Sequence, residues 1–517
     1  MSGHEKTQGA CGILLNRRQF AVASLASGLG LTTAARSATP PSASDAAGAP
    51  AKTGKDATDA SRLFARHFLD TRFEAVPADV VQITKMEILD SLGIAIAGAS
   101  QQGVMQVREL VMECAGKPES HLFGGTARVP AHDAGQVNAT MVHALDYDDV
   151  YEHAFVHPAV VSVPPAFAAA ECVGGLNGKD MIAAIALGVD MVCRLAAAAR
   201  PGVDAFTIGW HNTTLYGYLT SAMVTGKIMG LSEEQMVHAC GIAYHQCAGN
   251  AQAILDGALT KRMGPGFSVR AGMMAARLAK KGATGATHSL EGIKGLYALY
   301  HQGQYDRDVL LRDLGSKFAG SNVSFKPYPS CRGSHPSIDA ALALATGHDI
   351  KPNDIQEIIA TNGPGQYNLL STPLATKARP RTTVDMQFSV PWTVAVALLN
   401  RQVTTQDFTS KAMDNPAILA LTSKVKTQLD PSMVAPDGGV EPARVEVVLK
   451  NGERFSEQIN AARGSPEFPI SFEDCARKFT DNAGSAGLSQ SKIAEVIKQV
   501  AHLEDMPDAT ALLTLLS

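Results

Sequence analysis

The sequence predicts a mainly α-helical protein, with a large helical domain that contains an inserted, smaller α+β module. Two observations indicate this fold class. From residue 60 to about residue 321, one apolar helical segment follows another, and several begin at Pro or end at Gly. Between residues 322 and 462 the chain instead contains a proline-rich irregular stretch, strand-like segments and an Asn-Gly turn. Residues 463–517 return to helical patterning.

The first 38 residues predict a twin-arginine export signal. Arg17 and Arg18 precede a short apolar run that ends near Leu31, and small residues suited to cleavage follow. The alternative is an arginine pair that begins an ordinary helix. Residues 39–59 are rich in Ala, Ser, Pro, Thr and Gly and predict a disordered linker. We therefore expect a periplasmic protein with no membrane anchor after export.

Charge and cysteine content exclude several classes of function. The formal net charge is −4, and removal of the basic leader makes the remainder more acidic, so no nucleic-acid or anionic-membrane partner is expected. Anionic substrates must therefore be held by local cations. The eight cysteines form no CxxC pair, and most lie in apolar segments, which favours buried thiols over a disulfide framework.

The helices expected in the first part of the chain follow directly from apolar periodicity and end signals. Ser232 caps one of them, with Glu233 and Glu234 in its first turn. The segment 178–200 is apolar on nearly all faces, but its internal charges favour a bundle helix over a membrane span. The expected helices are 60–71, 77–98, 104–115, 131–144, 164–173, 178–200, 214–229, the segment after Ser232, and 267–281.

The inserted module and the C-terminal return have their own expected elements. A hairpin is expected where the strand 443–450 meets Asn451-Gly452 and continues into the segment RFSEQI. The other expected elements are a strand at 354–362 and helices at 338–346, 385–400, 471–479 and 489–503, with a short helix at the C-terminus.

A loop dense in titratable groups follows the helix 131–144. It contains the carboxylates Asp146, Asp148, Asp149 and Glu152, two tyrosines, and the histidines His153 and His157, and His143 lies beside it at the end of the helix. Carboxylates raise imidazole pKa values and imidazolium lowers carboxylate pKa values, so such a loop is suited to proton transfer.

Familiar catalytic signatures are missing from the sequence. The motifs GxxxxGK[ST], GxGxxG, GxSxG and HExxH do not occur, which argues against the usual nucleotide-binding, serine-hydrolase and zincin classes. His153 and His157 have the spacing of helical zinc ligands, but Pro158 follows and the loop does not look helical. No metal is expected.

Three further polar or cationic motifs lie beside apolar helices. They are GWHNTT at 209–214, TKRMGPG at 260–266, and FKPYPSCR at 325–332 with His335 close behind. Cations that converge on a loop of carboxylates suit a small polycarboxylate substrate.

These four motifs, in this order, resemble the MmgE/PrpD family, which includes 2-methylcitrate dehydratase, cis-aconitate decarboxylase and iminodisuccinate epimerase. The resemblance extends from residue 60 to the end and includes AGMMAARLAKKGATG and DMQFSVPW. It implies a helical domain with an inserted α+β lid, usually a homodimer, and neither metal nor organic cofactor.

The resemblance also implies roles for individual residues. Asp146 would be the active-site carboxylate that orients an imidazole, and His157 and His211 the proton-transfer pair. Lys261 and Lys326 would bind substrate carboxylates. Further substrate contacts are expected at Tyr147, Arg332 and His335, although lid hydrogen bonds explain the last two equally well. Structural roles are expected for Asp148, Asp149, His143, His245 and His301.

Departures from the family pattern bear on the particular reaction. Val150 replaces the usual Thr, Ala159 replaces a Ser, and the loop is longer by residues that include Glu152 and His153. We expect a cofactor-free lyase acting on a di- or tricarboxylate, foremost a 2-methylcitrate dehydratase-like hydro-lyase. The alternatives are a decarboxylase or epimerase on the same scaffold, and a periplasmic polycarboxylate-binding protein that has lost catalysis.

Overall fold

Helices dominate the described residues, 58–435 and 439–517, of the computed structural model. The mainly α fold class is confirmed. The predicted export signal, and the linker up to residue 57, lie outside the described residues. Asp59, which the sequence assigned to the linker, is buried and caps the first helix by accepting from the backbone N–H of Ser61.

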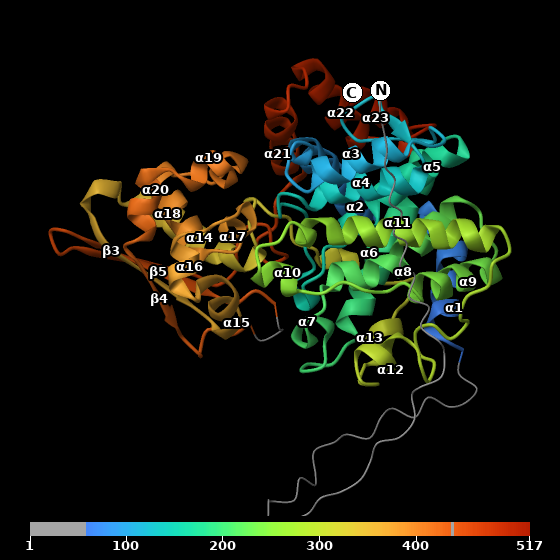
Figure 1. The fold of residues 1–517 in the computed structure, drawn as a ribbon, viewed down its shortest axis with the longest axis horizontal. Helices are drawn as coiled ribbons and strands as arrows, with labels where there is room; N and C mark the ends of the chain where they lie inside the picture. Colours follow the sequence, from blue (N-terminus) through green and yellow to red (C-terminus); the bar gives the residue numbers. More distant parts are fainter. Residues whose placement is uncertain (1–57, 436–438) are drawn as a thin grey trace, which may run out of the picture. The chain divides into compact units, whose positions relative to one another are not determined.

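The first part of the described chain is a stack of long helices (Figure 1). Each has a counterpart in the sequence-based expectation, mostly within a few residues at either end. They are α1 (Ala60–Asp70), α2 (Ala78–Gly98), α3 (Val104–Cys114), α4 (Ala131–His143), α5 (Val163–Val173), α6 (Gly178–Ala197), α8 (Asn212–Ile228), α9 (Glu233–Tyr244) and α11 (Thr260–Lys280). Short helices connect them: α7 (Ala205–Ile208), α10 (Gln252–Leu255), α12 (Leu296–Tyr300) and α13 (Arg307–Leu311), and β1 (Ser120–His121) pairs with β2 (Arg128–Val129).

Helix α11 lies against α4, α8 and α9 (Figure 1). Glycines bring its backbone close to its neighbours. A Cβ on Gly272 would lie 2.5 Å from the Tyr218 carbonyl oxygen of α8, and one on Gly266 would lie 2.6 Å from the Gln136 carbonyl oxygen of α4. Larger side chains at these positions would push the helices apart.

The start of α11 corrects the sequence-based expectation, which placed it at residue 267. The helix begins at Thr260, and the TKRMGPG motif forms its first turns. Gly264 and Gly266, which precede the expected start of the helix, pack against Thr214 and Thr140 of neighbouring helices. Pro265 is accommodated inside the helix. Glycine and proline usually mark a turn, but glycine also occurs where helices pack closely together. The expected start of the helix was therefore placed too late.

The second part of the chain contains a four-stranded sheet in the order β4-β3-β5-β6. Strands β3 (Ile355–Asn362) and β4 (Val425–Leu429) are parallel, whereas β5 (Ala443–Leu449) is antiparallel to both β3 and β6 (Arg454–Ile459). The predicted hairpin at 451–452 is therefore confirmed. Strand β4 was missed because Val425 is its only buried residue and polar residues occupy the next three positions.

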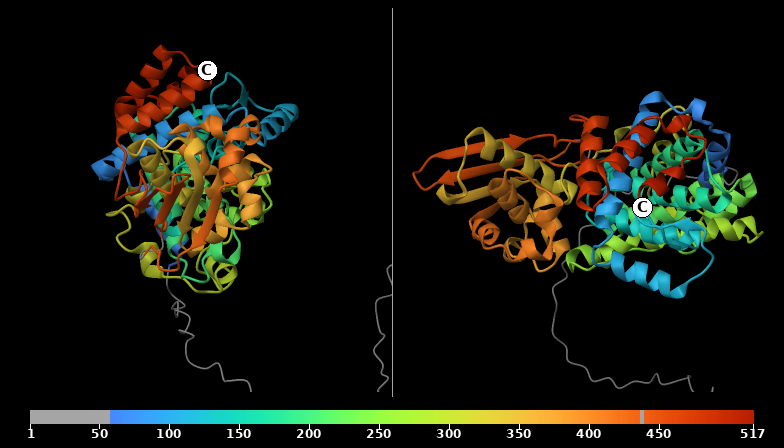
Figure 2. Two further views of the ribbon diagram at one scale, coloured as in Figure 1. Left: turned by 90° about the vertical axis from the view of Figure 1, so that its left-hand side faces the viewer. Right: turned by 90° about the horizontal axis from the view of Figure 1, so that it is seen from above.

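Helices cover one face of this sheet (Figure 2). Helix α14 (His335–Gly347) packs on β5 and β6 and on α18 (Val390–Asn400). The expected helix 385–400 is divided into α17 (Thr383–Gln387) and α18, because Ser389 caps α18 by accepting from the backbone N–H of Trp392. Other short helices here are α15 (Pro364–Gln366), α16 (Leu374–Ala378), α19 (Ser410–Met413) and α20 (Pro416–Thr422).

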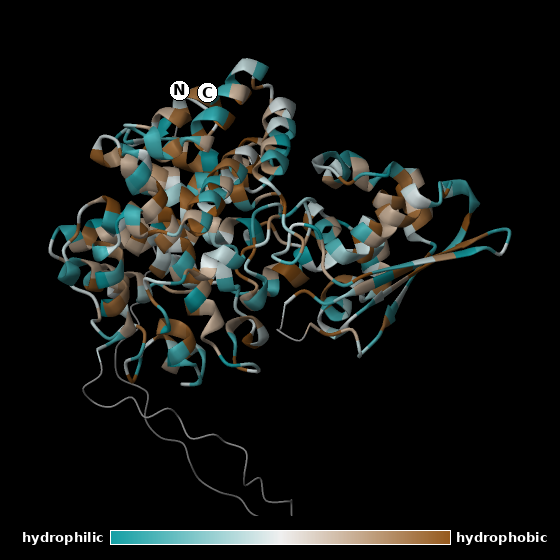
Figure 3. Cartoon of the chain, turned by 180° about the vertical axis from the view of Figure 1, so that it is seen from behind, coloured by the Kyte–Doolittle hydropathy of each residue, from teal (hydrophilic) through white to brown (hydrophobic). Residues whose placement is uncertain are grey.

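Two hydrophobic clusters divide the core. One is built from residues of α1–α11 and of the C-terminal helices, and the other lies between residues 328 and 447, around the fully buried Trp392. Hydrophobic and hydrophilic residues alternate along the strands (Figure 3), as expected for a sheet with one covered face. Among the described helices, none has both the length and the apolar content that a bilayer crossing requires.

The C-terminal segment returns to the helical part. It contains α21 (Phe472–Ser485), α22 (Gln490–Ala501) and α23 (Ala511–Leu515). Helix α21 packs along α2, where Gly93 admits Phe479: a Cβ on Gly93 would lie 2.9 Å from its ring. This return brings Lys478 beside the loop at residues 146–157, which is rich in titratable groups and is called the charged loop below.

Candidate active site

The carboxylate of Asp146 lies between two buried lysines. Asp146 lies in a tight turn that follows α4. It adopts the left-handed backbone conformation (φ 51°), which Asp tolerates better than most residues. One carboxylate oxygen accepts from Lys261 Nζ, and the other accepts from Lys326 Nζ at 2.5 Å. Lys326 also donates to the Asp146 carbonyl oxygen at 2.9 Å. All three residues are buried.

This arrangement leaves a surplus of positive charge. Burial alone would raise the pKa of Asp146, but Lys261 and Lys326 hold it well below its usual range, so the carboxylate is ionised. Two ammonium groups therefore share one carboxylate. A further carboxylate, brought by a ligand, would complete the neutralisation.

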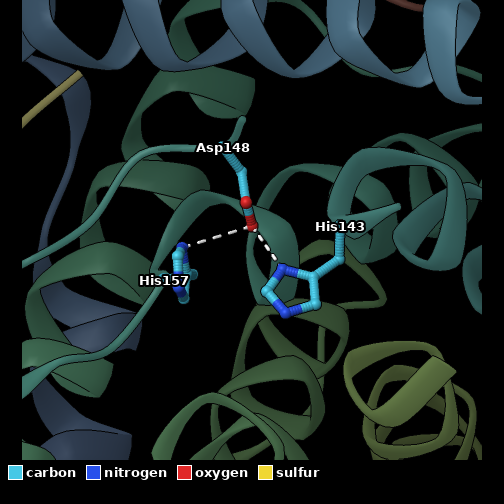
Figure 4. A group of neighbouring side chains, drawn as sticks. All are labelled: His143, Asp148 and His157. Atoms are coloured by element: carbon cyan, nitrogen blue, oxygen red, sulfur yellow. Dashed lines mark hydrogen bonds and ion pairs between the residues drawn. The ribbon is translucent and has the colours of Figure 1, made fainter. Parts of the chain in front are cut away.

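The imidazoles of His143 and His157 lie on either side of the carboxylate of Asp148 (Figure 4). Oδ2 of Asp148 lies 2.7 Å from His143 Nδ1 and 3.5 Å from His157 Nδ1. The ring of His143 lies 4.9 Å from that of His157 and 5.6 Å from that of His211, between ring centres. His143 and Asp148, which the sequence assigned to structural roles, thus lie at the centre of the cluster.

Hydrogen bonds fix which imidazole nitrogens are free. Nδ1 of His157 lies 2.6 Å from the Asp149 carbonyl oxygen, so this nitrogen carries a proton and Nε2 keeps its lone pair. Nδ1 of His211 lies 2.8 Å from Thr214 Oγ1. Burial lowers the pKa of His143, His157 and His211 well below the usual range, so the three rings are neutral near pH 7 and able to accept a proton.

The same three side chains have the spacing of a possible metal site. One ligand atom each from His143, Asp148 and His157 lies within 4.8 Å of the other two. The His157 nitrogen nearest Asp148, Nδ1, donates to a backbone carbonyl, so a metal there would have to displace that hydrogen bond. His153, which the sequence paired with His157 as a conceivable zinc ligand, is in a single 3₁₀ turn, so the pair does not share an α-helical face.

Three predicted substrate contacts are engaged inside the protein. The hydroxyl of Tyr147 donates to the Pro327 carbonyl oxygen at 3.0 Å. The guanidinium of Arg332 donates to Glu152 Oε1 at 2.6 Å and to the Arg463 carbonyl oxygen at 2.8 Å. His335 is fully buried and lies 3.1 Å from Arg332. These residues hold the segment around Lys326 in place.

Glu152 and Val150, two of the departures named above, lie in the same network. Glu152 Oε1 accepts from Arg332 and, at 2.5 Å, from Ser324 Oγ. Val150 pairs through its backbone with Ser324, with N···O distances of 2.9 and 2.7 Å. The loop is thereby joined to the chain that leads into Lys326.

A residue that sequence reasoning missed, Lys478, fixes the position of this loop. Its Nζ lies 2.7 Å from Asp90 Oδ1 and donates to the carbonyl oxygens of Tyr147 and Lys326 at 2.8 and 2.9 Å. It also lies 3.6 Å from the centre of the Tyr147 ring. A single ammonium group thus joins the residue after Asp146 to the lysine that binds Asp146. No local motif around Lys478 marks this role.

We expect Lys478→Met to destabilise the protein by about 3–5 kcal/mol, because it leaves the buried Asp90 without a counter-ion. The double variant Lys478→Met/Asp90→Asn should recover part of that loss, since it also removes the uncompensated charge. Thermal unfolding of the two single variants and the double variant measures this coupling. Simple additivity of the two single losses would contradict the ion pair as the source of stability.

Relatives named as cis-aconitate decarboxylases or as similar to them align with most of this chain. Human cis-aconitate decarboxylase is 28% identical over 84% of this chain and 90% of its own length. Cis-aconitate decarboxylase of Aspergillus terreus (strain NIH 2624 / FGSC A1156) is 26% identical over 86% of this chain and 92% of its own length. The cis-aconitate decarboxylase-like protein oryM of Aspergillus oryzae is 25% identical over 86% of this chain and 94% of its own length.

Family models cover both halves of the chain. The model of the MmgE/PrpD N-terminal domain matches residues 62–308, which include Asp146, His157, His211 and Lys261. The model of the MmgE/PrpD C-terminal domain matches residues 328–503, beginning just after Lys326 and including Lys478. The chain belongs to the MmgE/PrpD family.

Proposed function

We propose that the protein is a lyase that removes a carboxylate group, as carbon dioxide, from a small polycarboxylate of the cis-aconitate type. The observation that carries the proposal is the pair Lys261 and Lys326 on one carboxylate, beside neutral buried imidazoles. The cations can bind substrate carboxylates, and the imidazoles can move protons. The relatives named as cis-aconitate decarboxylases support this chemistry over dehydration.

In this proposal each group has one task. Lys261 and Lys326 hold carboxylates that remain on the substrate. The C–C bond to the leaving carboxylate breaks, its electron pair passes to the conjugated carbon framework, and carbon dioxide departs. His157 or His211, protonated once substrate is bound, then gives its proton to carbon. Asp146 orients the lysines, and Asp148 stabilises the imidazolium.

Dehydration of a 2-methylcitrate-like substrate uses the same groups differently. One imidazole would take the proton next to a carboxylate, and another would protonate the leaving hydroxyl. The sequence favoured this reaction, and an epimerase would need only the proton transfers. The relatives reported above are named for decarboxylation, which favours that reaction, so dehydration is the second candidate.

We also propose that residues 322–462 act as a lid and that the mature enzyme is a periplasmic homodimer. The burial of Lys326 and Asp146 supports the lid, because substrate can reach them only if the surrounding chain opens. The twin-arginine pair supports export. N-terminal sequencing of periplasmic protein tests it, and a cytoplasmic, unprocessed chain would contradict it.

Incubation of the purified protein with cis-aconitate should release carbon dioxide and give an unsaturated dicarboxylate. His157→Gln should lower kcat by about 10²–10⁴-fold, because the proton donor is lost. Lys411→Met, which removes an exposed lysine of α19, is the matched control and should leave turnover unchanged. Loss of water from 2-methylcitrate without carbon dioxide release would establish the dehydratase instead. Binding of polycarboxylates that survives His157→Gln, with no turnover of any, would identify a binding protein.

Binding of a polycarboxylate should be accompanied by proton uptake at pH 7. In the free protein, burial and the charges of Lys261 and Lys326 lower the pKa of His143. Added negative charge raises this pKa, so binding should be accompanied by uptake of up to about one proton by the ring. Calorimetry in buffers of different ionisation enthalpy measures this number, and His143→Gln should reduce it. Proton release across pH 6–8 would contradict the proposed charge balance.

A further inference from the structure

Arg262 is a buried cation without a carboxylate partner. It lies in the first turn of α11, next to Lys261, and only 1% of its surface is exposed. Among the described residues, every other buried lysine or arginine is paired with a carboxylate: Lys85 with Glu504, Arg194 with Asp190, Lys261 and Lys326 with Asp146, Arg332 with Glu152, and Lys478 with Asp90.

The contacts of Arg262 are neutral and incomplete. Its Nη1 donates to the Gln102 carbonyl oxygen at 3.1 Å, and its Nη2 donates to Thr383 Oγ1 at 3.0 Å and to Gln387 Oε1 at 3.4 Å. Its Nε has no hydrogen-bond partner, although the atom is buried. A buried guanidinium with only neutral acceptors and an unsatisfied N–H is costly in free energy.

The position of the guanidinium is restrained. Gly103 packs against its stem, so that a Cβ there would lie 3.1 Å from Arg262 Cδ. The group acts on the candidate site electrostatically: its charge contributes to lowering the pKa of His143, after burial and the two lysines. Burial lowers the pKa of Arg262 itself to about 10, and Asp146 opposes this shift. The guanidinium remains charged at neutral pH.

We propose that Arg262 binds a carboxylate of the substrate, as a third cationic contact beside Lys261 and Lys326. The inference rests on the proposed function, since it requires a polycarboxylate in this site. The free Nε–H and the planar fork suit one carboxylate, and the anion supplies the missing counter-charge. Because Thr383 and Gln387 belong to α17, the same guanidinium joins the substrate to the sheet-containing region.

The alternative is that Arg262 only ties α11 to α17 and to the chain before α3. Such a role would affect stability, but it would not depend on how many carboxylates a ligand carries. The two explanations are therefore separated by comparing ligands that differ by one carboxylate.

Calorimetry of the full chain with propane-1,2,3-tricarboxylate and with pentanedioate, which lacks the middle carboxylate, provides this comparison. We expect Arg262→Gln to weaken tricarboxylate binding at least about tenfold more than dicarboxylate binding, because two lysines can still serve the smaller ligand. Arg262→Lys keeps the charge but loses the fork and should give an intermediate ratio. It also serves as the second variant should Arg262→Gln fail to fold.

Equal losses for the two ligands, or no loss for either, would overturn the role of Arg262. Should that happen while the unaltered enzyme still converts cis-aconitate, only this inference fails. If the unaltered protein neither binds the two ligands nor acts on any polycarboxylate, the proposed function fails and the inference fails with it.

Discussion

The ion pairs of Asp146 with Lys261 and Lys326 are the interaction on which the rest of the site depends. The two lysines lie 115 and 180 residues beyond Asp146 in the sequence, yet both reach one buried carboxylate. Without that carboxylate, two like charges would be buried together, which is strongly destabilising. Without the lysines, the left-handed backbone of Asp146 would lack the contacts that hold it. Each of these three residues therefore requires the other two. Together they fix the relative positions of α4, α11 and the chain before α14.

Further buried ion pairs extend this arrangement outward. Lys478 joins α21 to α2 through Asp90 and holds two carbonyl groups of the site. Arg332 joins the chain before α14 to the charged loop through Glu152. Apolar packing alone tolerates small shifts between helices, whereas hydrogen-bonded charge pairs demand defined distances and angles. Hydrophobic burial therefore accounts for the two cores, and the charges account for the alignment of the loop between them.

A structural feature could be predicted from the sequence where adjacent residues determine it, and could not where it depends on remote segments. Helix ends marked by Ser232 or Gly98, and the hairpin at Asn451-Gly452, were found because a few adjacent residues determine them. The start of α11 was misplaced, because glycine used for helix contact looks like glycine used for a turn. At the site, Asp146, His157, Lys261 and Lys326 stand in motifs. Lys478 and Arg262 were missed because their partners come from remote segments and only the fold shows which charges are paired. His143 and Asp148 are partners only five residues apart. They were undervalued because the sequence does not show that they are buried together.

Charge balance connects the geometry to the choice of substrate. Lys261, Lys326 and Arg262 supply three cations, whereas Asp146 and Asp148 supply two carboxylates, the second of them beside the imidazoles. In the proposed function, substrate carboxylates bound at the three cations neutralise the remaining positive charge. Burial, with a smaller contribution from the lysine charges, lowers the pKa of the nearby imidazoles and keeps them unprotonated while the site is empty. In the proposed function, the negative charge of the substrate offsets the lysine charges and raises the imidazole pKa values, which favours the proton donor that the reaction needs. Binding and proton transfer are then consequences of one electrostatic arrangement.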